Sequence, residues 1–267
     1  MSGRPAFGLL LAAALAVALA FLVLPVVAIF TDTPPGELVR SLGDPSARDA
    51  LRLSLLCSLA AVAIVVVVGT PAAYGLATRA FPGKAVVVTL VELPLVLPPA
   101  VAGIGLLAAL GPQGLLGGLV EDAGVRLVLT TGGVICALTF VAAPFYLRQA
   151  QAAFAAVDRT WIDVSRTLGA GEGRTFARVA IPAAGPGLLA GLALAWGRAL
   201  GEFGATLMFA GSFRGITQTV PLAIYERFAT DFTGALALSA VLVAVSAALL
   251  AAVKLLSGTA WLGGAAR

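Results

Sequence analysis

Two residues of opposite charge, Arg198 and Glu202, stand four positions apart within a long apolar run. In a helix this spacing places the two side chains one turn apart on the same face. Either charge alone would cost about 2.5–3.5 kcal/mol at the centre of a membrane-spanning helix, so we expect the two to pair on an interior face. Such a pair is either a structural ion pair or part of a passage for ions, which it lines or gates. Thr206, in the same segment, is a further candidate for that passage.

Glu92 is another charge in an apolar segment, and Pro94, Pro98 and Pro99 follow it closely. Proline removes a backbone donor and breaks a helix, so we expect a broken or kinked span here. A break exposes helix ends, and the amino-terminal end of a helix favours anions. We interpret Glu92 as structural, tethered by Arg198 or by backbone donors. The candidate residues of a path or gate are therefore Arg198, Glu202, Thr206, Glu92 and Pro98.

Other kinds of chemistry find little support in the sequence. It contains no histidine, the commonest metal ligand and the usual proton carrier near neutral pH. Its two cysteines, Cys57 and Cys136, lie in apolar runs at no metal-like spacing and are interpreted as small buried hydrophobic residues. The nucleotide-binding pattern G-x-x-x-x-G-K-[ST] does not occur. We therefore expect no metal site and no enzyme activity in this chain.

The elements that must position these residues are membrane-spanning helices. Hydrophobic residues make up 60% of the sequence and charged residues 11%, whereas soluble domains carry about 25% charged residues. We expect an all-α integral membrane protein that forms one transmembrane domain over residues 1–267. Its six spans cover about residues 7–30, 51–78, 85–110, 127–147, 183–211 and 235–256. The first run is longer than the core of a signal peptide, so we expect it to remain uncleaved.

Basic residues indicate how the spans are oriented. With the amino terminus inside, the cytoplasmic segments hold Arg4, Arg79, Lys84, Arg148, Arg159, Arg166, Arg174, Arg178, Lys254 and Arg267. The outer segments hold Arg40, Arg48, Arg52, Arg126, Arg214 and Arg227. This bias predicts that both termini are cytoplasmic. It also explains the net charge of +4 without any binding of nucleic acid.

A charged segment, residues 152–182, separates the fourth span from the fifth. Apolar residues recur in its first half at spacings of three and four, which is typical of an amphipathic helix: Phe154, Val157, Trp161, Val164 and Leu168. Gly169, Gly171 and Gly173 interrupt the pattern, and a second short helix is expected to end at Pro182. From the pattern alone, this helix–turn–helix either lies on the bilayer surface or docks onto a partner.

In its register the segment resembles the EAA loop of ABC-importer permeases, which runs E-A-A, three residues, G, nine residues, I-x-L-P. The matching positions here are Asp163-Val164-Ser165, Gly169 and Val179-Ala180-Ile181-Pro182, with Asp163 in place of Glu and Val164-Ser165 in place of Ala-Ala. The resemblance implies a type I importer permease whose cytoplasmic coupling loop docks onto a separate ATPase dimer. The coupling residues would be Asp163, Ser165, Leu168, Gly169, Ala170, Ile181 and Pro182. It also implies a homodimer, with ATP and magnesium bound by the ATPase and no cofactor bound by this chain.

The run RALGEFGATLMFAG, which begins at Arg198, and the segment Thr217–Tyr225 resemble molybdate permeases, whose close relatives carry tungstate or sulfate. The resemblance implies oxyanion import across the inner membrane of a prokaryote, with a periplasmic or lipid-anchored binding protein as a partner. An outer gate or binding-protein contact would use Thr217, Gln218, Thr219 and Pro221. Two alternatives stay open, namely a sulfate or thiosulfate permease and a stand-alone secondary transporter with Arg198, Glu202 and Glu92 as an ion relay.

Overall fold

The chain is almost entirely helical. The computed structural model describes residues 3–264, with the side chains of residues 7–253 and of Leu255. The predicted orientation depends partly on residues outside this description. They are both chain ends, including Arg267, and the side chains of Arg4 and Lys254. Within it there is no strand, and the helices are α1 Gly3–Thr31, α2 Pro35–Gly43, α3 Pro45–Thr78, α4 Lys84–Val96, α5 Pro99–Leu110, α6 Gly117–Asp122, α7 Thr131–Ala155, α8 Arg159–Thr167, α9 Glu172–Thr175, the π-helix η1 Phe176–Ala180, α10 Ile181–Leu200, α11 Gly204–Ala210, α12 Val220–Phe228 and α13 Phe232–Gly264.

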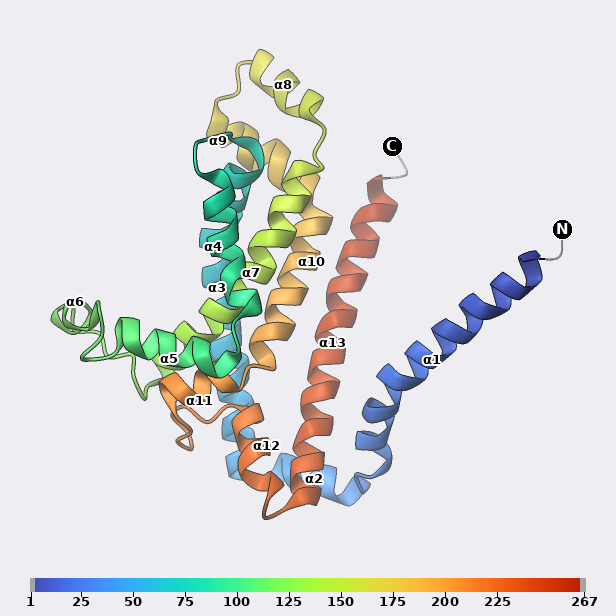
Figure 1. The fold of residues 1–267 in the computed structure, drawn as a ribbon, viewed down its shortest axis with the longest axis vertical. Coiled ribbons are helices and arrows are strands. Elements are labelled where there is room, and N and C mark those ends of the chain that lie inside the picture. The colour runs from blue at the N-terminus through green and yellow to red at the C-terminus, as the bar shows by residue number, and fades with distance from the viewer. Residues whose placement is uncertain (1–2, 265–267) are drawn as a thin grey trace.

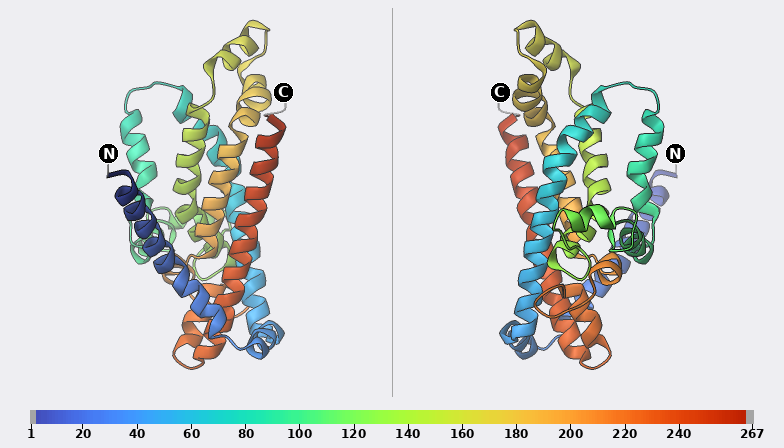
Figure 2. Two further views of the ribbon diagram at one scale, coloured as in Figure 1. Left: turned by 90° about the vertical axis from the view of Figure 1, so that its right-hand side faces the viewer. Right: turned by 90° about the vertical axis from the view of Figure 1, so that its left-hand side faces the viewer.

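Five of the described helical stretches are long and apolar enough to cross a membrane, and α4 with α5 makes a sixth if this bent pair counts as one span. The predicted all-α membrane fold is thus confirmed. The bundle has two distinct ends (Figures 1 and 2). α8 and α9 project from one end, whereas α2 and α12 lie at the other. α1 leaves the bundle at an angle, and the rest of the chain buries none of its apolar window.

α3, α7 and α10 form the centre of the bundle, where small residues allow close approach. A Cβ atom at Gly69 of α3 would stand 3.0 Å from the ring of Tyr146 of α7. The hydroxyls of Tyr146 and Thr70 are 2.7 Å apart, and Trp196 Nε1 of α10 donates to Ser58 Oγ of α3 at 3.0 Å. These polar side chains are thereby satisfied by neighbouring helices.

The third predicted span, 85–110, is two helices rather than one. α4 and α5 are bent by 118° at the break between Val96 and Pro99. Pro98 and Pro99 lack the N–H groups that would continue the helical hydrogen bonds, so the helix ends there. The predicted break is confirmed, and the bend is large enough that α5 extends sideways from the bundle (Figure 1).

The helices that contain the fourth and fifth predicted spans have other bounds than those spans. α7 continues to Ala155, so Arg148 lies inside this helix. α10 ends at Leu200, and α11 begins at Gly204 after a short break. Arg198 therefore lies in the last turn of α10, whereas Glu202 follows the end of that helix.

The sequence predicts that the second helix of the segment 152–182 ends at Pro182, and this prediction is wrong. α9, η1 and α10 instead run without interruption from Glu172 to Leu200. The Ile181 N–H bonds to the Phe176 carbonyl five residues back, which is the wider turn of a π-helix. Such a turn directly before a proline accommodates the missing N–H without ending the helix.

Candidate functional site: a buried ion pair and a projecting helix

Arg198 and Glu202 form the predicted ion pair. Arg198 Nη1 lies 2.6 Å from Glu202 Oε2, and the Glu202 side chain is 1% exposed against 28% for Arg198. The other carboxylate oxygen, Oε1, accepts the backbone N–H of Ala205 at 2.8 Å. Ala205 lies in the first turn of α11, where N–H groups lack partners within the helix and the helix dipole favours negative charge. Glu202 therefore stabilises the start of α11 and holds the Arg198 guanidinium at the break between two helices.

The start of α5 packs against the same break. A Cβ atom at Gly204 of α11 would stand 2.8 Å from Pro99 Cβ, so these two helix starts are in direct contact. Thr206 of α11 is fully buried, and its hydroxyl has no hydrogen-bond partner among the described residues. The junction of α5, α10 and α11 thus brings together four of the candidate path residues, namely Arg198, Glu202, Thr206 and Pro98.

Glu92 does not join this group, and its predicted tether to Arg198 is wrong. Glu92 Oε1 lies 2.9 Å from Nε of Arg148 on α7. The reason is the sharp bend, because Glu92 precedes the break on α4 and α4 packs against α7. The sequence did not predict Arg148 as the partner of Glu92, because a basic residue after an apolar run usually marks the membrane surface. The residues from Arg148 to Phe154 include good helix formers and no glycine or proline, and this is the signal that could have placed Arg148 inside the helix.

The predicted amphipathic stripe is divided between two helices. Phe154 lies in the last turn of α7 and is buried, with its ring centroid 6.1 Å from that of Phe176. The chain then turns, and the Asp158 carboxylate accepts the Thr160 N–H at 2.9 Å to begin α8. Hydrogen bonds from Thr160 lower the pKa of Asp158 below its ordinary value, because they favour the ionised carboxylate.

α8 ends in a Schellman turn. The Gly169 N–H bonds to the Arg166 carbonyl at 2.9 Å, and the Ala170 N–H bonds to the Ser165 carbonyl at 3.1 Å. Gly169 has φ of +83°, a conformation that costs glycine little and other residues more. The glycine of the predicted turn is thus required by the backbone itself.

Side-chain contacts then tie α8 to the helix that follows it. The Ser165 and Thr175 hydroxyls are 3.0 Å apart, and Thr175 is fully buried. Glu172 lies 3.2 Å from Arg79, just after α3, and 3.9 Å from Arg166. These contacts set the direction in which α8 projects.

The outer face of α8 is apolar and unoccupied by the rest of the chain. Trp161, Val164 and Leu168 are 57%, 51% and 82% exposed. The Asp163 carboxylate makes no hydrogen bond or ion pair with any described residue. Large exposed apolar side chains gathered on one element are typical of an interaction surface. Of the other coupling candidates, Ile181 is half-buried and Pro182 is exposed.

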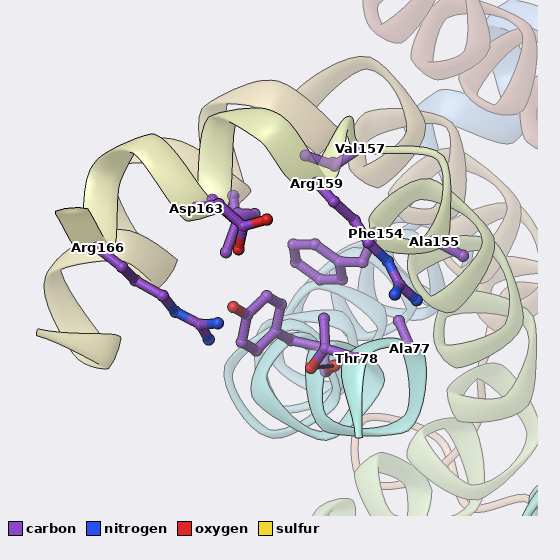
Figure 3. A pocket seen from close by; sticks show the side chains of 11 residues that line it. Ala77, Thr78, Phe154, Ala155, Val157, Arg159, Asp163 and Arg166 are labelled. Atoms are coloured by element: carbon purple, nitrogen blue, oxygen red, sulfur yellow. Dashed lines mark hydrogen bonds between the residues drawn. The ribbon is translucent and has the colours of Figure 1, made fainter. Parts of the chain in front are cut away.

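A cavity of about 270 Å³ separates α8 from the bundle (Figure 3). Its walls come from Thr78 of α3, Phe154 of α7 and the polar side chains Arg159, Asp163 and Arg166 of α8. Figure 3 shows these polar side chains directed into the space between the helices. α8 therefore contacts the bundle through Ile162 and Ser165, and the cavity lies beside these contacts.

The segment after α11 is folded inward. Thr217, Gln218 and Thr219 are buried, and only Pro221 of the predicted outer residues is partly exposed. Thr217 Oγ1 accepts the Phe213 N–H at 2.9 Å, so this side chain shapes the loop. Such burial fits a gate better than direct contact with a binding protein. The role of the four residues stays a prediction.

One ion pair at this end was not expected from the sequence. Arg227, near the end of α12, pairs with Asp44, the residue that caps α3. Partial burial raises the pKa of Asp44, but hydrogen bonds from Arg227 and the Ser46 N–H, with the charges of Arg227 and Arg214, hold it below its ordinary value. The two partners are far apart in sequence, and no local pattern links them.

Comparisons with known proteins agree with this geometry. Residues 66–259 match the family "Binding-protein-dependent transport system inner membrane component". The chain is 41% identical to the "Molybdenum transport system permease protein ModB" of Mycobacterium tuberculosis, over 85% of this chain and 86% of that one. It is 34% identical to the "Sulfate transport system permease protein CysW" of Synechococcus elongatus, over 71% and 66%.

Among solved structures, the chain resembles one described as a "bacterial ABC transporter involved in the import of the acidic polysaccharide alginate". The TM-score is 0.72 at 17% identity, with 95% of both chains covered. At this identity the likeness concerns the fold alone. The family match and the sequence relatives together establish that the chain belongs to the inner-membrane permease components of binding-protein-dependent transport systems.

Proposed function

We propose that the chain is the permease subunit of an ATP-driven importer for a tetrahedral oxyanion, with molybdate or tungstate as the substrate. The similarity to a molybdenum permease over 85% of the chain carries the substrate assignment. Two copies of the chain would form the path between them, with both chain ends and α8 in the cytoplasm.

The partner on the cytoplasmic side would be a dimer of ABC ATPases. α8 suits this role because it projects from the bundle, exposes Trp161, Val164 and Leu168, and leaves Asp163 unpaired. ATP and magnesium would bind to the ATPase, so this chain needs no cofactor. Closure of the ATPase dimer would move α8, and the hydrogen-bonded turn at Gly169 would transmit the movement to α10.

The passage for the anion would run by the junction of α5, α10 and α11. Arg198 offers positive charge there while Glu202 keeps the guanidinium in place. A basic side chain at membrane depth lowers the cost of bringing an anion into a medium of low dielectric constant. The outer partner would be a periplasmic or lipid-anchored binding protein, which would supply most of the specificity among similar oxyanions.

A sulfate or thiosulfate importer is a second candidate, and the sulfate permease of Synechococcus elongatus favours it. Its lower identity and shorter coverage than those of the molybdenum permease place it second. A stand-alone secondary transporter has no support from the family match.

The test is to express the chain with a cognate ATPase and binding protein, and to reconstitute the purified complex in liposomes. We expect a complex of two permeases with two ATPases. Its ATP hydrolysis should be stimulated by binding protein loaded with molybdate or tungstate, and less by protein loaded with sulfate. If the chain instead transports anions alone, driven by an ion gradient, the importer proposal is wrong.

A further inference from the structure

A second ion pair joins two stretches that are apolar enough to span a membrane, between Arg148 of α7 and Glu92 of α4. Arg148 precedes the last residue of α7, Ala155, by seven positions, and Glu92 follows the first residue of α4, Lys84, by eight. At 1.5 Å of rise per residue these offsets are about 10 and 12 Å. Both side chains therefore start at a similar depth below the end of the bundle that carries α8.

This pair is not enclosed by its own chain. The side chains of Arg148 and Glu92 are 48% and 36% exposed, in contrast to the 1% of Glu202. Charged side chains at membrane depth almost always face a bundle interior or a water-filled cavity and not lipid. The face formed by α4 and α7 must therefore meet a polar space or the second copy of the chain. In a permease whose path lies between two copies, a polar space at this face and contact with the second copy would both place the pair at the path.

The packing of α7 on α10 relates this pair to Arg198. A Cβ atom at Gly191 of α10 would stand 3.1 Å from Gln149 Cβ, so Gly191 is level with the residue next to Arg148. Arg198 follows Gly191 by seven positions on α10, which is about 10 Å along the helix. The two arginines thus lie at two levels of the bundle, with Arg148 nearer to α8.

α4 packs mainly against α7. It has no buried residue, and its first residue follows Gly83, whose φ is +81°. Its other end is the break before Pro99. A helix bounded by two such points needs only a small movement to separate the Glu92 carboxylate from Arg148.

We propose that Arg148 is a second anion-binding position on the path and that Glu92 is its exchangeable counter-ion. This inference rests on the proposed function. A tetrahedral dianion that leaves Arg198 replaces the Glu92 carboxylate on Arg148, and Glu92 returns when the anion departs. Two moderate sites at levels about 10 Å apart along the helix axis divide one high barrier into smaller ones, and neither site retains the anion.

The first test asks whether water reaches the face formed by α4 and α7. The two cysteines can be replaced (Cys57→Ala, Cys136→Ala) to give a background without thiols. Into it we would introduce Glu92→Cys and, as a matched control on the opposite face of α4, Leu90→Cys. In the complex with its ATPase, the anionic reagent methanethiosulfonate ethylsulfonate should modify the cysteine at 92 and spare that at 90. Molybdate should slow the modification at 92. If the cysteine at 92 is as inert as that at 90, the proposal is wrong.

The second test separates an anion site from a structural pair. The double variant Glu92→Gln with Arg148→Gln removes both charges and leaves two polar amide side chains at the positions of the pair. We expect ATP hydrolysis stimulated by loaded binding protein to stay within about twofold of wild type, and anion import per ATP to fall about tenfold or more. Arg148→Lys should retain most import. Unchanged import in the double variant would overturn the second site and leave the proposed function intact. Failure of the wild-type complex to import at all would instead overturn the proposed function.

Discussion

Gly103 of α5 lies so close to Ala205 of α11 that a Cβ atom at Gly103 would stand 2.7 Å from the Ala205 carbonyl oxygen. No flexible side chain can yield there, because the neighbouring atom is backbone. The contact fixes α5 beside the first turn of α11, where the Ala205 N–H donates to the Glu202 carboxylate. α5 and α11 therefore form one packed unit next to the buried ion pair.

Gly103→Ala should weaken this unit. Inserting a methyl group into a packed interface costs about 1–3 kcal/mol, which outweighs the gain in helix propensity of about 1 kcal/mol. The matched control is Gly105→Ala on the same helix, where nothing lies within 4 Å of the new Cβ atom. Thermal unfolding followed by size-exclusion chromatography should show a lower melting temperature for the first variant only. Equal melting temperatures would contradict the packing argument.

Gly169→Ala should impair coupling and leave the protein inserted in the membrane. Alanine at φ of +83° is strained, and we expect a local cost of about 1 kcal/mol that disturbs the end of α8. Gly171→Ala is the control, since Gly171 has φ of −67° and open space around it. ATP hydrolysis stimulated by the binding protein is the measurement. A normal response of the Gly169 variant would argue against a coupling role for this turn.

Arg198→Ala should reduce the yield of folded protein, since it leaves the buried Glu202 carboxylate without its counter-charge. Removal of one partner of a buried pair costs about 3–5 kcal/mol. The neutral double variant Arg198→Gln with Glu202→Gln should assemble better, because no charge stays buried, yet it should import little anion. Yield and import measured side by side separate the two effects. Import at the wild-type rate by the double variant would leave Arg198 with a structural role only.

The ion pair between Asp44 and Arg227 should make the stability of the bundle end that carries α2 and α12 depend on pH. The pKa of Asp44 is lowered in the folded protein, so its contribution is fully present above the ordinary value of 3.8 and is lost as the pH falls through the folded pKa. Asp44→Asn should lower the melting temperature at pH 7 and have less effect near pH 3. Asp49→Asn is the control, at an exposed carboxylate five residues along the chain. A pH-independent effect of Asp44→Asn would contradict this account.

The fold and part of the site could be predicted from sequence because the signals are local. Apolar runs mark the spans, the spacing of Arg198 and Glu202 marks a pair, and Gly169 marks a turn. The partners of Glu92 and Asp44 could not be predicted, since Arg148 and Arg227 reach them only through tertiary packing. The continuation of α7 beyond the predicted fourth span was not expected for a related reason, because Arg148 resembles a surface residue until its carboxylate partner is known.

Pro182 shows a second limit of sequence reasoning. A proline ordinarily ends a helix, yet the π-turn before it lets the helix from Glu172 to Leu200 continue. The continuous helix formed by α9, η1 and α10 thereby connects the turn after α8 to Arg198. A rigid connection of this kind suits the transmission of movement from the ATPase to the path.

The most direct test of the account is uptake of radiolabelled molybdate into proteoliposomes that contain the complex, with ATP enclosed and loaded binding protein outside. We predict uptake that requires ATP, the binding protein and an intact α8, and that is lost when Trp161 and Leu168 are both changed to serine. Uptake without ATP or binding protein, or unaffected by that double change, would contradict the account.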